Sequence, residues 1–301
     1  MNCAFYGRGE EDENAMKHQM YQVGRRVAVL FLLSLLGGLL GATLVRFAPG
    51  YGVDERELDP RMSQQSIESI RASSRANSNL LAYYGQFFRG VFHGDLGNSQ
   101  WLQRPIASLI RERFPVTLRS VLLGTLLAWV AALAGALIAS LSSSFVLEVS
   151  GTLVSGILIA LPVAVVAMLA VYTGAPVPMA IAVVLAPKLF RYVRNLLAHA
   201  NAQPHVLAAQ ARGVGRGRIL SHHIFPYVSP ALFAVLGVSL SMAFGAAIPI
   251  EALCDSPGIG QLAWQAALNR DLPLIMNLTL LTTLITVGAN WLANLSDRGV
   301  M

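Results

Sequence analysis

Long apolar runs separated by short polar segments dominate the chain. Because a bilayer core about 30 Å thick needs roughly 20 helical residues to cross it, we divide the runs at that length. Six membrane-spanning helices are predicted: Val27–Val45, Ser120–Ser140, Ser150–Tyr172, Val177–Leu197, Ser229–Ile250 and Pro273–Leu295. The pattern therefore predicts an all-α integral membrane protein with six transmembrane helices.

Two of these divisions need an argument. The uncharged stretch 149–187 is too long for one crossing, and residues 173–178 read Thr-Gly-Ala-Pro-Val-Pro, a helix-breaking cluster that separates the third span from the fourth. The first run follows Arg25 and Arg26, as a signal peptide would, but it has 19 uncharged residues in Val27–Val45 and no small-residue cleavage site. We interpret it as an uncleaved span.

Composition agrees with a membrane protein. Hydrophobic residues make up 54% of the 301 residues and charged residues only 13%, against roughly a quarter in soluble domains. The net charge of +6 could suggest nucleic acid, but the basic residues lie between apolar runs and form no separate basic domain, so nucleic-acid binding is not expected. Cys3 and Cys254 are predicted on opposite membrane faces, which argues against a disulfide.

Basic residues set the predicted orientation. Six of them, with no acidic residue among them, lie at or beyond the end of the fourth span: Lys188, Arg191, Arg194, Arg212, Arg216 and Arg218. The positive-inside rule places this loop in the cytoplasm, and counting spans then places both termini there. The predicted organisation is a cytoplasmic extension (1–24), a first transmembrane helix (25–48), an extracytoplasmic segment (49–115) and a five-helix core (116–297) containing a cytoplasmic loop (198–228).

The chain contains none of the motifs expected of a motor or an enzyme. Its only lysines, Lys17 and Lys188, do not follow the glycines of a phosphate-binding loop, so ATP hydrolysis by that route is excluded. Five of the six predicted spans lack the ionisable residues that ion-coupled carriers use. His222 and His223 have no accompanying Cys or carboxylate, so we interpret them as interfacial polar residues and expect no metal, cofactor or catalytic site.

A short helix is predicted inside the cytoplasmic loop. Pro204 stands at a first helical position and Gly213 just past the end, where a positive φ is expected. Small residues in its middle permit close approach, and a basic residue at its end complements the helix dipole. A helix this short gains stability mainly by docking. The candidate docking residues are His205, Ala208, Ala209, Ala211, Arg212 and Gly213.

This loop resembles the permease family of the dipeptide, oligopeptide and nickel ABC importers. The family pattern R-x-x-R, followed by a helix of the form Y-V-x-x-A-R-A-K-G, matches Arg191–Arg194 and His205–Gly213 without a gap. Flanking motifs also match, namely Pro49-Gly50, residues 93–99, residues 112–118, Glu251, residues 256–260, residues 269–273 and Asn290. His205 and Gln210 depart from the more usual Tyr and Arg.

The resemblance implies a type I ABC importer permease whose cytoplasmic helix couples it to ATPases. Implied partners are a second homologous permease subunit, two cytoplasmic ATP-binding subunits, an extracytoplasmic solute-binding protein and the lipid bilayer of the bacterial cytoplasmic membrane. The solute is a peptide, nickel or another small solute, and no substrate-binding residue is assigned. Two alternatives stay open from the residues alone, a stand-alone channel or secondary carrier and a membrane scaffold or receptor.

Three acidic residues and one turn are expected on the extracytoplasmic side of the membrane. Glu251, Asp255 and Asp271 are expected on the loop after the fifth span, where they either meet a binding protein or cationic solute or cap a re-entrant segment around Pro257-Gly258. The sequence His93-Gly94-Asp95 lacks a nearby nucleophile, so it predicts a turn and not a catalytic pair.

Overall fold

The computed structural model describes residues 85, 87, 89–91, 93–142 and 145–296. Within these ranges the chain is mostly helical, which confirms the predicted all-α class. The helices are α4 (Ile106–Ser142), α5 (Phe145–Ala160), α6 (Val163–Thr173), α7 (Val177–Asn201), α8 (Pro204–Ala211), α9 (Arg216–Ile219), the π-helix η2 (Leu220–Ile224), α10 (Phe225–Leu253), α11 (Ile259–Leu268) and α12 (Leu272–Ser296). The predicted cytoplasmic extension (1–24) and first transmembrane helix (25–48) lie outside the described residues.

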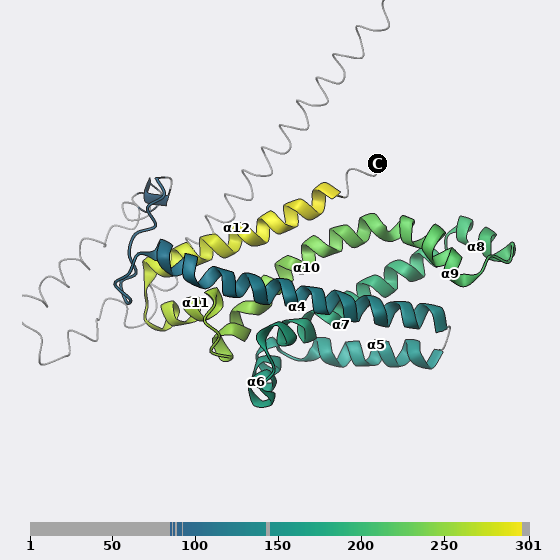
Figure 1. The fold of residues 1–301 in the computed structure, drawn as a ribbon, viewed down its shortest axis with the longest axis horizontal. Helices are drawn as coiled ribbons and strands as arrows, with labels where there is room; N and C mark the ends of the chain where they lie inside the picture. The colour runs from purple at the N-terminus through teal and green to yellow at the C-terminus, as the bar shows by residue number, and fades with distance from the viewer. Residues whose placement is uncertain (1–84, 86, 88, 92, 143–144, 297–301) are drawn as a thin grey trace, which may run out of the picture.

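The long helices form an elongated bundle. In Figure 1, α4, α7, α10 and α12 run lengthwise, α11 lies at one end, and α8 and α9 lie at the other. A large apolar core joins α4, α7 and α10, with Ile181 and Ile250 fully buried in it. A smaller core around Ile106, Leu262 and Leu278 joins the start of α4 to α11 and α12. The large core extends from Val206 of α8 to Ile250 of α10, and Phe114 packs against both cores.

Glycines allow α4, α5 and α7 to approach closely. A Cβ atom at Gly124 of α4 would lie 2.8 Å from the Ile181 Cβ and 2.9 Å from a backbone carbonyl oxygen of α7. The Phe190 ring of α7 lies against both Gly135 of α4 and Gly151 of α5, where added Cβ atoms would come within 3.3 Å and 2.9 Å of it. Small residues at helix crossings are how membrane helices obtain dense packing when burial from water cannot drive association.

The predicted third span is broken. Helices α5 and α6 meet at a bend of 95°. Pro162 precedes α6 with ψ 142°, an extended conformation that no helix continues. Because proline lacks a backbone N–H and fixes φ, a helix arriving from its N-terminal side ends there. The expected helix Ser150–Tyr172 is therefore a bent pair of shorter helices.

The predicted break between the third and fourth spans is confirmed. Gly174 ends α6 in the left-handed conformation with φ 68°. Its N–H bonds the Val171 carbonyl and the Ala175 N–H bonds the Ala170 carbonyl, the paired pattern of a Schellman cap. The next helix, α7, has a proline in its first turn, where a missing N–H costs nothing.

The number of crossings is only partly established. Three helical stretches of the described chain are long and apolar enough to cross a membrane, Ile106–Ser140, Arg216–Leu253 and Leu272–Asn290, or four if the bent pair is one crossing. Helix α7, predicted as the fourth span, has 25 residues and carries Lys188, Arg191 and Arg194. Helix α4 begins at Ile106 and passes through Pro115, so the expected boundary at 115/116 falls inside a helix. The six-span topology stays a prediction.

Candidate functional site

The short helix predicted in the loop after α7 is present as α8, Pro204–Ala211. Pro204 lies in its first turn, and Gly213 takes φ 78°, as expected for the residue just past the end. The Gly213 N–H bonds the Gln210 carbonyl at 2.9 Å and the Val214 N–H bonds the Ala209 carbonyl at 3.2 Å. These bonds form a Schellman cap, so the helix end is closed by a conformation that side chains larger than glycine resist.

Helix α8 has one face in the core and one face exposed. Val206 is 0% exposed and Ala209 1% exposed, and both belong to the large apolar core. Leu207 is 52% exposed, and Ala208 and Ala211 are exposed with it. The structure thus fixes the helix by its inner face and presents a surface of small and apolar residues on the other.

The six candidate docking residues are brought together but do not share one face. His205, Ala208, Ala211, Arg212 and Gly213 are exposed, whereas Ala209 points into the bundle and cannot itself touch a partner. The exposure of Leu207 was not predicted from the sequence. Leu207 is next to Ala208 and points away from the buried face of the helix, but an eight-residue helix of mostly small residues has too little contrast between polar and apolar positions to show which face is buried.

Basic side chains surround the exposed face. The Arg212 Nε donates a hydrogen bond to the Ala208 carbonyl at 3.2 Å, and the Arg212 backbone N–H donates to the same oxygen at 3.3 Å, so the side chain is held against the end of α8. Arg216 and Arg218 follow on α9 and are exposed as well. The sequence holds no acidic residue between 149 and 250, so the charges of α8, α9 and the loop between them are all basic.

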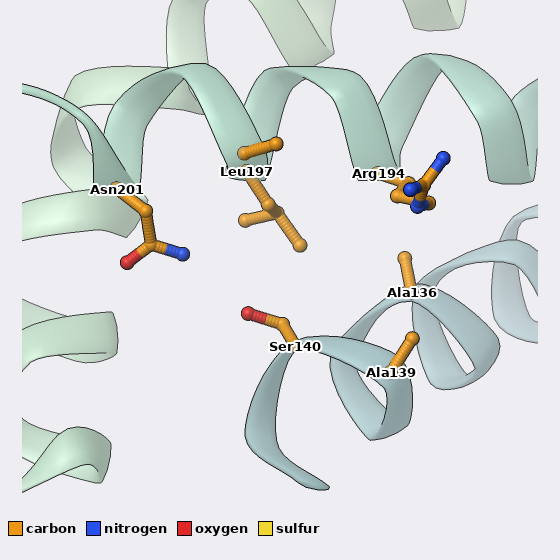
Figure 2. A pocket seen from close by; sticks show the side chains of 7 residues that line it. Ala136, Ala139, Ser140, Arg194, Leu197 and Asn201 are labelled. Atoms are coloured by element: carbon orange, nitrogen blue, oxygen red, sulfur yellow. The ribbon is translucent and has the colours of Figure 1, made fainter. Parts of the chain in front are cut away.

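Two neighbouring open pockets lie at the end of the bundle that carries α8. One, of about 480 Å³, is lined by the ends of α4 and α7, by α8 and by α9 and η2, with Gln210, Arg216 and Ile224 among its lining residues. The second, of about 200 Å³, lies between the ends of α4 and α7, and its polar lining comes from Ser140, Arg194 and Asn201 (Figure 2). Both pockets share Ser140 and Asn201. The packing of α8 against the neighbouring helices therefore leaves open space on one side.

At the opposite end of the bundle a buried carboxylate joins three helices. Glu251, in the last turn of α10, is 0% exposed. Its Oε2 accepts hydrogen bonds from the Thr117 hydroxyl of α4 at 3.0 Å and from the Gly260 N–H of α11 at 2.8 Å. The Ile259 N–H in turn donates to Thr117 Oγ1 at 2.8 Å. We call Thr117, Glu251, Ile259 and Gly260 the Glu251 cluster. It satisfies the first N–H groups of α11, which a helix start otherwise leaves unpaired.

A second buried carboxylate fastens the segment before α4. Asp271 is 1% exposed and accepts hydrogen bonds from the Ser99 hydroxyl, from the Trp101 N–H at 3.1 Å and from the Leu274 N–H at 3.2 Å. The last of these caps the start of α12. Asn277 adds a bond from its amide to the Leu96 carbonyl at 3.0 Å. The extended segment 96–101 is thus held on α12.

These contacts decide between the two sequence readings of the acidic residues. Glu251 lies in α10 and not on the following loop, and its bond to the Gly260 N–H caps the segment after Pro257-Gly258 as the capping interpretation expected. Asp271 is also a buried cap, but it caps the start of α12 and not that segment, so for Asp271 the expected capping partner was wrong. Asp255 is exposed and accepts from Gln261, which also accepts from Arg113 at 3.0 Å. The predicted turn at His93-Gly94-Asp95 is confirmed, because Gly94 takes φ 79°.

The part of the chain that the structure describes contains no group of three or more His, Cys, Asp or Glu placed to hold a metal ion. His222 accepts or donates a hydrogen bond with the Ser221 hydroxyl at 2.8 Å, according to its tautomer. The arrangement as a whole is a helical bundle with the partly exposed helix α8 at one end and buried carboxylates that join helices at the other.

Comparison with known proteins agrees with this arrangement. A Brucella suis protein whose name proposes it as a peptide transport system permease is 26% identical over 306 residues, covering 90% of this chain and 94% of that protein. The nickel import system permease protein NikB of Staphylococcus aureus is 24% identical over 297 residues, covering 93% and 89%. Residues 124–300 match the family described as the binding-protein-dependent transport system inner membrane component. The apolar helices and this match make the chain a multi-pass membrane protein, an ABC transporter permease that belongs to that family.

Proposed function

We propose that this chain is the membrane-spanning subunit of an ATP-driven importer for peptides or similarly small solutes. It crosses the bacterial cytoplasmic membrane six times with both termini in the cytoplasm. It pairs with a second homologous permease, two cytoplasmic ATPase subunits and an extracytoplasmic solute-binding protein. The observation that carries the proposal is α8, which is anchored through Val206 and Ala209 and exposes its other face at one end of the bundle.

The proposed mechanism uses α8 as a lever. Closure of the ATPase pair on ATP moves the docked helix, and because the inner face of α8 is part of the core, the spans move with it. The free energy transferred equals the difference between the binding free energies of the ATPases for the two states of the permease. The permease itself makes and breaks no covalent bond. A stand-alone channel or carrier has no use for an anchored helix with a small, basic outer face.

Nickel is the second candidate solute. It rests on the similarity to the Staphylococcus aureus nickel permeases, which covers nearly the whole chain. Neither solute has a binding residue assigned in this chain. Measuring uptake of labelled peptide and of nickel by the same reconstituted transporter separates the two.

A pair of tryptophan substitutions tests the docking surface. Ala208→Trp adds bulk to the exposed face, so the permease is expected to reach the membrane in normal amount but to lose ATPase subunits on purification, at a cost of about 1–3 kcal/mol of binding. Ala209→Trp, one residue along, adds the same bulk to the buried face. It is expected to lower the amount of folded permease itself. Normal ATPase recovery with Ala208→Trp would remove α8 from the interface.

Cysteine labelling tests the orientation. In a background with Cys3 and Cys254 replaced by serine, Gly217→Cys places a thiol beside α8 and Asn269→Cys places one at the opposite end of the bundle, both at exposed positions. A membrane-impermeant thiol reagent added to intact cells is expected to label Asn269→Cys alone. Gly217→Cys should react only after the membrane is permeabilised. The reverse pattern would invert the proposed topology.

A further inference from the structure

Three aromatic rings connect the first turn of α8 to the first turn of α10. The His205 ring centroid lies 5.8 Å from that of Tyr227 at an interplanar angle of 54°, and 6.4 Å from that of His223 at 43°. Tilted rings at these separations attract each other through their edges and faces. His205 therefore contacts side chains 18 and 22 residues further along the chain, which belong to the helix leading into the next predicted span. We call His205, His223 and Tyr227 the ring cluster.

The backbone route between the same helices is poorly suited to carry a displacement. Residues 212–215 connect α8 to α9 and include Gly213 and Gly215, and Gly217 follows inside α9; a Cβ atom at any of the three would meet nothing within 4 Å. The cap of α8 fixes Gly213, but glycine has the widest choice of backbone conformations and no packed side chain restricts Gly215. A push on α8 can be absorbed by this connection. The ring cluster bypasses it.

The second ring sits on an unusual turn. His223 belongs to the π-helix η2, Leu220–Ile224, in which the Phe225 N–H bonds the carbonyl of Leu220, five residues earlier. A π turn holds one more residue than an α turn and is found at functional positions more often than its rarity suggests. It places His223 half-buried toward His205, while the preceding His222 is exposed. The two neighbouring histidines point in different directions, as consecutive residues of a helix do, and of the two only His223 joins the ring cluster.

We propose that the ring cluster is a contact, in addition to the buried inner face of α8, through which movement of α8 is passed to α10. Its three residues act as positioning residues, because none of them touches solute or nucleotide in this scheme. The inner face of α8 holds the helix on the core, and the ring cluster fixes its angle relative to the start of α10. This inference rests on the proposed coupling role of α8.

The test uses the complete reconstituted transporter, with both permeases, the ATPases and the binding protein. His223→Ala and Tyr227→Ala, which are outside the candidate docking residues, are each expected to keep the ATPases bound and to keep hydrolysing ATP, while the solute moved per ATP falls by about threefold to tenfold, the size of one aromatic contact. His205→Ala removes both ring contacts and should lower the ratio at least as far. His205→Tyr keeps a ring at the same position and should restore the ratio. His222→Ala is the matched control, an exposed neighbouring histidine outside the ring cluster, and should leave the ratio unchanged.

The outcomes separate this inference from the function it rests on. An unchanged ratio of transport to ATP hydrolysis in both His205→Ala and His223→Ala would overturn the role of the ring cluster. Loss of ATPase subunits from His205→Ala would also overturn it, because His205 would then be a docking contact. Transport by the wild-type permease without any ATPase subunit would instead overturn the proposed function. The double variant His205→Ala/His223→Ala should be no worse than His205→Ala alone, since His205→Ala already removes the contact with His223.

Discussion

Replacing Gly258 with alanine is expected to reduce folded permease in the membrane severely. Gly258 is buried, and the added Cβ atom would overlap the Glu251 carboxylate. That carboxylate cannot move aside easily, because its Oε2 holds the Thr117 hydroxyl and the Gly260 N–H. The backbone of Gly258, φ −103° and ψ −173°, is extended and suits alanine, so the expected effect is steric and not conformational.

The cost combines two terms. Overpacking a filled site costs about 1–3 kcal/mol, and each buried donor that loses its acceptor costs about a further 1–3 kcal/mol. The measurement is the amount of monodisperse permease recovered in mild detergent and its midpoint of thermal unfolding. Gly245→Ala is the matched control, since an added Cβ atom at that exposed α10 position meets nothing within 4 Å. Equal behaviour of the two variants would show that the Glu251 cluster does not hold α11.

Proline and glycine residues that begin or end helices made part of this structure predictable. The breaker cluster 173–178 and the residues Pro204 and Gly213 act through φ restrictions and missing donors, which operate within a few residues. The helix α8 and the start of α7 accordingly appear where the sequence indicates them. Fold class followed from apolar content, because the bilayer permits few backbone arrangements.

Features that depend on contacts between residues far apart in the chain could not be predicted from the sequence. The Glu251 cluster pairs Glu251 with Thr117, 134 residues away, and no periodicity in either helix indicates that contact. The buried face of Ala209 was missed for a different reason. Alanine fits a lipid, core or interface position equally well, so only the surrounding core shows which it occupies. The bend at Pro162 lies in an unbroken apolar run, where length alone suggested one crossing.

Asp271→Ala is expected to have the second largest effect, on the segment preceding α4. Asp271 is buried and accepts from the Ser99 hydroxyl, the Trp101 N–H and the Leu274 N–H, so alanine leaves three donors without their acceptor. Loss of the helix cap costs about 1 kcal/mol, and the unpaired buried donors add to it at about 1–3 kcal/mol each. The segment 96–101 should detach from α12 before the bundle itself unfolds, since the large core lies elsewhere.

Limited proteolysis measures that detachment directly. Asp271→Ala should be cut within residues 96–104 at protease concentrations that leave the wild type whole, and its thermal midpoint should fall. Asp271→Asn keeps one acceptor oxygen for the α12 cap but loses the charge that strengthens the bonds from Ser99 and Trp101, so it should lie between alanine and wild type. Exposed Asn269→Ala, two residues earlier, should match the wild type. If Asp271→Ala resists the protease as well as Asn269→Ala does, then the apolar contacts of Leu96 and Leu102 with the smaller core hold this segment without the carboxylate.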